Sequence, residues 1–190
     1  MDAWRLPTKL NIGGKDWDIR TDFRVVLDVI SALTDPDLEN DEKWLACLMI
    51  MFVDFDKLPS SDYGEACEQV KTFIDMGADK KDENGPVHPR VMDWEHDAQM
   101  IIPAVNRVMN KEIRAEAYIH WWTFLSAYME IGECTYSHVL NIRTKKAKGK
   151  KLEKWEQEFL RNNKDLVTLE TKKSQDEIEE EKLIKELLGV

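Results

Sequence analysis

The chain has 190 residues, of which 43% are hydrophobic and 34% charged, and its formal net charge is −10. This length and apolar content suit one sizeable domain, or a domain with an extension, and they exclude a wholly disordered chain. The negative charge argues against broad binding to nucleic acid or to anionic membranes, which needs a basic surface.

Residues 10–19 carry the clear strand signal of the sequence. Gly13-Gly14 separates two alternating segments, and both glycines can take the positive φ angles of a two-residue hairpin turn. In that register Leu10 faces Trp17, and one face of the ribbon is apolar. A lone hairpin is marginally stable, so we expect it to lie on the helices that follow.

Three helices are predicted next. The first begins at the capping residue Asp22 and ends before Pro36, and the second starts near Asn40. The third starts at Asp62, which has capping-box spacing to Glu65. The second helix carries the apolar residues Trp44, Leu45, Leu48, Met49 and Phe52 and should stop around residues 54–59.

A polar loop over residues 78–89 separates these helices from a fourth, predicted over residues 94–109. Asp93 is a good N-cap for that helix, because its carboxylate can accept a bond from an unpaired first-turn N–H. Pro103 lies inside the helix and costs about 3 kcal/mol there, so we expect a kink or a break.

A central helix is predicted over residues 114–131, after a polar joint at residues 110–112. Apolar residues recur in it at helical spacing around the sequence His-Trp-Trp at 120–122. Gly132 should end the helix, and a shorter helix over residues 136–143 should follow. The two adjacent tryptophans project about 100° apart and can pack against different neighbours.

The C-terminal part is more strongly charged. Residues 143–154 contain seven basic residues and one acidic residue. This run can be a solvated turn between helices or a partner for the acidic residues 176–181, with phosphate binding as the minor alternative. Residues 152–169 form a short heptad-like apolar stripe, and residues 178–188 form an amphipathic one.

The sequence thus predicts a mainly α fold, with an N-terminal β-hairpin and a C-terminal charged amphipathic helical extension. We expect residues 1–145 to form the helical domain. Residues 146–190 would then supply a basic linker, a helix and an acidic amphipathic tail. The amphipathic tail cannot bury its own apolar face and must dock on the body, another subunit or a partner.

Few residues suggest chemistry. His96 lies near Asp93 and Asp97 on one helical face, which permits a metal site, but a solvated helix start is the favoured interpretation. His120 is expected to be a core histidine rather than a base, and no nucleophile motif accompanies it. We therefore expect no enzymatic activity, no cofactor and no metal. The absence of a signal-peptide pattern and of long apolar runs, with three scattered cysteines, predicts a reduced cytoplasmic protein without a membrane anchor.

Several motifs occur together in an order that resembles a known family. They are Thr-Asp-Phe-Arg at residues 21–24, Asp-Trp-Glu-x-Asp-Ala at residues 93–98, and His-Trp-Trp-x-Phe at residues 120–124. Their order and spacing, over about residues 6–154, resemble the phage "gene product fifteen" family of tail-assembly proteins. That family comes from long-tailed phages and prophages of Gram-positive bacteria.

The resemblance implies a tail-assembly chaperone that acts in the host cytoplasm. Such a protein would coat the tape-measure protein, help tail-tube subunits polymerise around it, and then leave. The alternative is a structural minor tail or connector protein that stays in the virion, and self-association remains open. The residues we predict to contact a partner are Leu152, Trp155, Phe159, Ile178, Leu183, Ile184, Leu187 and Leu188.

Overall fold

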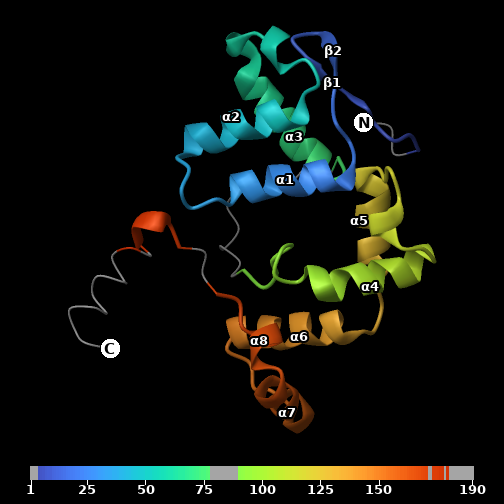
Figure 1. Ribbon diagram of the computed structural model, residues 1–190, viewed down its shortest axis with the longest axis vertical. Helices are drawn as coiled ribbons and strands as arrows, with labels where there is room; N and C mark the ends of the chain where they lie inside the picture. The colour runs from blue at the N-terminus through green and yellow to red at the C-terminus, as the bar shows by residue number, and fades with distance from the viewer. Residues whose placement is uncertain (1–3, 78–89, 171–172, 178, 180–190) are drawn as a thin grey trace. The chain divides into compact units, whose positions relative to one another are not determined.

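The computed structural model describes residues 4–77, 90–170, 173–177 and 179 (Figure 1). These residues fall into two compact units. The first contains the described residues up to 77 together with 173–177 and 179, and the second contains residues 90–170. The prediction of a mainly helical chain with an N-terminal hairpin is confirmed. Among the described residues, no helix has the length and apolar character needed to cross a membrane.

The hairpin has the predicted register. Strands β1 (Lys9–Ile12) and β2 (Lys15–Asp18) are antiparallel, and Leu10 pairs with Trp17. Gly13 and Gly14 have φ angles of 60° and 74°, a left-handed conformation that residues with a Cβ atom rarely adopt. The apolar face is buried, and β1 packs against α3 (Tyr63–Ile74).

Helices α1 (Phe23–Leu33) and α2 (Asn40–Met51) lie side by side in the first unit (Figure 1). Asp22 caps α1 as predicted, because its carboxylate accepts the N–H of Arg24 at 3.0 Å. Arg20, just after the hairpin, donates to the carbonyls of Ile50 and Phe52 at 2.8 and 2.6 Å. The guanidinium thereby satisfies carbonyls at the end of α2 and ties this end to the hairpin.

The start of the third helix differs from the expectation. Short 3-10 turns η1 (Phe55–Lys57) and η2 (Ser60–Asp62) precede α3, and Asp62 makes no capping bond. The predicted capping box is wrong because Glu65 has another partner, the N–H of Gly13 in the hairpin turn, at 3.0 Å. The polar loop predicted over residues 78–89 lies outside the described residues.

The second unit begins with a turn rather than with a helix. Helix α4 (Ala98–Met109) starts four residues later than predicted and continues through Pro103 without a break. Of the kink or break expected at this proline, the kink stays a prediction. It packs against α5 (Trp121–Met129), α6 (Thr135–Ala147) and the 3-10 turn η3 (Ile113–Ala115). Asn110, at the predicted polar joint, ends α4 in the left-handed conformation with φ 52°.

The predicted central helix is much shorter than expected. Helix α5 spans Trp121–Met129, and His120 is its N-cap rather than a residue of its middle. The His120 Nδ1 atom accepts the N–H of Trp122 at 3.0 Å, which replaces the bond that a preceding helical turn would provide.

The last helices of the second unit surround a small apolar cluster. Helix α6 (Thr135–Ala147) packs against α8 (Lys164–Val167), which in turn contacts α7 (Lys154–Asn162). The cluster consists of Val139, Ile142 and Val167, with Met100, Leu152, Phe159 and Leu160 against it. The domain boundary predicted after residue 145 falls inside α6.

Candidate functional site

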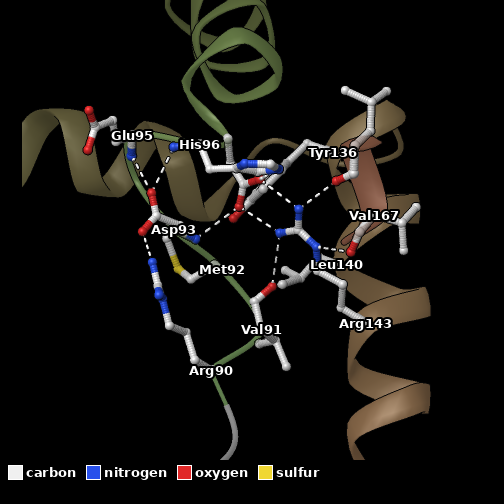
Figure 2. Close-up of polar contacts among 12 residues, drawn as sticks. Arg90, Val91, Met92, Asp93, Glu95, His96, Tyr136, Leu140, Arg143 and Val167 are labelled. Atoms are coloured by element: carbon white, nitrogen blue, oxygen red, sulfur yellow. Dashed lines mark hydrogen bonds and ion pairs between the residues drawn. The ribbon is translucent and has the colours of Figure 1, made fainter. Parts of the chain in front are cut away.

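A buried ion pair is the best-defined polar centre of the second unit (Figure 2). Asp97 immediately precedes α4 with its side chain fully buried, and Arg143 on α6 has a side chain that is 5% exposed. The guanidinium donates to both carboxylate oxygens, at 2.8 and 2.9 Å. This bidentate geometry is what an arginine, and not a lysine, can provide.

The remaining donors of Arg143 bind backbone carbonyls. Its Nε donates to Val167 at 2.9 Å, and its two terminal nitrogens donate to Leu166 at 2.6 Å and Val91 at 3.2 Å. All five N–H donors of the guanidinium are therefore used. Through them one side chain joins residues 90–97, α6 and the end of α8.

Asp93 caps the turn that precedes α4. Its carboxylate accepts the N–H groups of Glu95 and His96 at 2.9 and 2.7 Å, and it pairs with Arg90. The N–H of Asp93 itself donates to Asp97 at 3.0 Å. Asp93 is therefore a capping residue, as predicted, but it caps the turn before α4 and not the helix itself. Asp97, which precedes α4 directly, turns inward to bind Arg143.

The same contacts bear on the metal site considered for His96. Its Nε2 lies 4.0 Å from Asp97, but both neighbouring carboxylates already serve the ion pair and the turn. In the described part of the chain, no group of three His, Cys, Asp or Glu side chains could hold a metal ion. Figure 2 shows the Asp93 carboxylate directed toward the backbone N–H groups of Glu95 and His96 and toward Arg90.

Two tyrosines lie close to the ion pair. The hydroxyls of Tyr128 and Tyr136 are 2.9 Å apart, and Tyr128 also donates to the sulfur of Met92 at 3.5 Å. Burial raises the pKa of both hydroxyls above the ordinary value of 10, so both are protonated at neutral pH. Trp94 packs on this group with its ring centroid 4.9 Å from that of Tyr128. The pair therefore extends the packing around residues 90–97.

A second buried carboxylate attaches α7 to α6. Glu156 is fully buried and accepts from Lys145 at 2.6 Å and Asn141 at 2.9 Å. It also accepts the N–H of Glu153 at 2.7 Å, which starts α7. The hydrogen bond from the Lys145 ammonium is the main cause that lowers the pKa of Glu156.

The basic run is thus divided between two environments. Arg143 and Lys145 lie inside the fold, while the segment after Ala147 forms the connection between α6 and α7. The interpretation as a turn between helices is confirmed for this segment. Pairing with the acidic residues 176–181 and binding of phosphate stay predictions.

The predicted contact residues in and just before α7 do not share one environment. Leu152 and Phe159 are partly buried against the cluster around Val139, whereas Trp155 remains 47% exposed. Asn163 separates α7 from α8, so the heptad-like stripe is not one continuous helix. The other predicted contact residues, Ile178, Leu183, Ile184, Leu187 and Leu188, lie outside the described residues.

An exposed apolar stripe occurs on α2. Leu45 and Met49, one helical turn apart, are 43% and 55% exposed, and Val53 just after the helix is 51% exposed. Of the apolar residues noted in the sequence of this helix, Leu48 is buried together with Cys47 and Met51, whereas Leu45 and Met49 face solvent. A helix that is apolar on several sides gives no periodicity by which to choose the inner face.

Two residues of reactive type, Cys47 and His120, lie in settings that do not activate them. Burial raises the pKa of the Cys47 thiol to about 12, whereas a nucleophilic cysteine needs a lowered pKa. His120 is 3% exposed and uses Nδ1 to cap α5. The capping role was missed because histidine is not among the usual N-cap residues.

Comparison with models of known protein families identifies one family. The model of the family described as "Bacteriophage Gp15 protein" matches residues 4–169. No curated protein and no solved structure matches the chain. The matched region includes the hairpin, both buried carboxylate centres and α7 with α8. Because the match covers most of the sequence, the chain belongs to the bacteriophage Gp15 protein family.

Proposed function

We propose that this phage protein is a tail-assembly chaperone that binds the tape-measure protein and promotes assembly of the tail tube. Membership in the Gp15 family supports a role in the phage life cycle, and the motif order resembles tail-assembly proteins. A chaperone of this kind acts in the host cytoplasm and needs binding surfaces rather than reactive groups.

The exposed apolar stripe of α2 is the observation that carries the proposal. Leu45 and Met49 are adjacent on one side of a helix, and Val53 extends the apolar surface beyond its end. Such a stripe suits the apolar face of an amphipathic helix, which docks through residues spaced by three or four. Acidic residues in the first turn of α2, Asp41 and Glu42, keep the surface soluble in the absence of a partner.

The state of the titratable groups supports binding over catalysis. The Asp97 and Glu156 carboxylates are each neutralised by a basic side chain that also joins elements of the fold. The raised pKa values of Cys47, Tyr128 and Tyr136 keep these groups protonated at neutral pH. These groups stabilise the fold in their present protonation states, so we propose that the protein is not an enzyme.

A capture experiment with the tape-measure protein of the same phage tests the α2 surface. The variant Leu45→Ser/Met49→Ser should retain its circular dichroism spectrum and lose most of its tape-measure binding. Met129→Ser is the matched control, because Met129 is 70% exposed on α5 and lies outside the proposed surface. Equal binding by the double variant and the control would remove α2 from the account.

The C-terminal stripe is tested in parallel. Replacing Leu183, Ile184, Leu187 and Leu188 with Ser removes the apolar positions of this stripe. We expect reduced capture of the tape-measure protein and an unchanged unfolding midpoint. Unchanged capture would confine the contact to α2, Leu152, Trp155 and Phe159.

A further inference from the structure

The connection between α6 and α7 exposes a concentrated positive charge. Five lysines, which we call the lysine surface, have exposed side chains over this short segment: Lys146, Lys148, Lys150, Lys151 and Lys154. The chain turns at Gly149, with φ 63°, and the N–H of Lys150 donates to the carbonyl of Lys145 at 2.8 Å. This turn gathers the lysines around the junction of two helices.

The charge of the lysine surface is not used inside the second unit. Arg143 and Lys145 of the same basic run bind buried carboxylates, but none of the five exposed lysines forms an ion pair within residues 90–170. Exposed lysines in one block repel one another and attract an acidic partner.

An aromatic side chain lies at the edge of the lysine surface. Trp155 follows Lys154 and is 47% exposed, and its ring meets His138 edge-on with centroids 5.4 Å apart. The indole is therefore fixed by α6 and still offers one side to solvent. Lysines beside a held aromatic surface match a helix that is acidic on one face and apolar on the other.

The C-terminal sequence has that composition. Residues 176–188 contain six acidic and two basic residues, together with the apolar positions predicted to contact a partner. The helix signal at the start of this segment is present in the structure. Ser174 donates its N–H to Glu177 at 2.9 Å, and its hydroxyl accepts the N–H of Glu177 at 3.2 Å, as in a capping box.

The beginning of the tail belongs to the first unit. The N–H of Gln175 donates to Asp37, in the connection between α1 and α2, at 2.7 Å. Asp176, Glu177 and Glu179 are exposed, and within the described residues of the first unit none of them forms an ion pair. Considered by themselves, the described residues of the second unit thus include exposed lysines without an ion-pair partner, and those of the first unit include exposed carboxylates without one.

We propose that the lysine surface of one copy binds the acidic C-terminal segment of a second copy of this chain. Each copy then offers one lysine surface and one tail, so a contact between two copies leaves one of each unused. Such a head-to-tail contact adds further copies until the arrangement closes. The chain's net charge of −10 opposes a phosphate backbone as the alternative occupant of the lysine surface.

The contact is tested by sedimentation of the protein alone, so the result does not depend on tape-measure binding. The wild type should associate with rising concentration at low salt and become monomeric at about 0.5 M NaCl, where charges are screened within a few ångströms. Two charge-reversal variants should each stay monomeric: Lys148→Glu/Lys150→Glu/Lys151→Glu, and Glu179→Lys/Glu180→Lys/Glu181→Lys. Arg161→Glu/Lys164→Glu is the control, since it reverses two exposed charges outside the lysine surface and should associate like the wild type.

Mixing the two monomeric variants decides whether the contact joins two copies. The mixture offers two complementary contacts, a wild-type tail on a wild-type lysine surface and a charge-reversed tail on a charge-reversed surface, and should form a hetero-oligomer. A mixture that stays monomeric would overturn the proposal, as would a wild type that is monomeric at all concentrations. Binding of a short DNA duplex that requires the lysines, without self-association, would assign the surface to nucleic acid instead.

Discussion

Replacing Arg143 should destabilise the second unit more than any exposed substitution. The variant Arg143→Met keeps an unbranched apolar stem and removes the charged guanidinium from a site where Asp97 is fully buried. Removing one partner of a buried ion pair costs about 3–5 kcal/mol, because the other charge is left without compensation. The carbonyls of Val91, Leu166 and Val167 lose their donor as well. Since domains are stable by about 5–15 kcal/mol, this loss is a large part of the total.

Urea unfolding followed by tryptophan fluorescence measures the effect, with Trp94, Trp121 and Trp122 as probes in the second unit. Arg161→Met is the matched control, because Arg161 is exposed on α7 and should change the unfolding free energy by less than about 0.5 kcal/mol. Adding Asp97→Asn to Arg143→Met removes the uncompensated charge and should recover part of the loss. A cost below about 1 kcal/mol for Arg143→Met would refute the role given to the ion pair.

Three further predictions concern groups that the fold holds in defined states. Because the fold lowers the pKa of Glu156, this carboxylate adds to the free energy of unfolding above its ordinary pKa of 4.5, and that contribution is lost as the pH falls through the lower pKa of the folded state. In the variant Glu156→Gln, the free energy of unfolding should therefore depend less on pH in this acid range. In a Cys67→Ser/Cys134→Ser chain, the Cys47 thiol, with its pKa raised to about 12, should react with a disulfide reagent only after urea unfolding, and rapid reaction in the native chain would contradict its burial. His120→Ala should cost about 1 kcal/mol by removing the cap of α5, and His120→Asn should cost less, as urea titrations of both variants would show.

The hairpin could be predicted because its signal is local. Two adjacent glycines at the turn fix the pairing, and the alternation on either side leaves one choice of buried face. Asp22 was found for the same reason, since a cap bonds within two or three residues of itself. The structure adds the partner of the turn, Glu65, which is distant in the sequence.

The helix boundaries that failed depend on tertiary contacts. Asp93 has every local feature of an N-cap, but α4 starts only after Asp97 has turned toward Arg143. Apolar residues continue at helical spacing on both sides of residue 120. The pattern therefore did not indicate that the helix begins only at Trp121. In α2 the apolar residues occur on several sides, so packing against α1 and α3 selects Cys47 and Met51 instead of Leu45 and Met49.

One feature of the sequence could have indicated the buried ion pair. Arg143 continues the buried positions Tyr136 and Val139 of α6 at helical spacing, although composition assigned it to the basic run that follows. A charged residue on an apolar face is buried only with a partner. Which of the 37 acidic residues supplies that partner depends on how the helices pack, and local patterns contain no information about it.

Co-expression with the tape-measure protein of the same phage is the decisive test of the chaperone role. If this chain is the chaperone, the tape-measure protein becomes soluble and elutes with several copies of the chain, as affinity capture and light scattering would show. The chaperone role also predicts that purified virions lack the chain. A tape-measure protein that stays insoluble, together with stoichiometric recovery of the chain from virions, would contradict the chaperone role and indicate a structural tail protein.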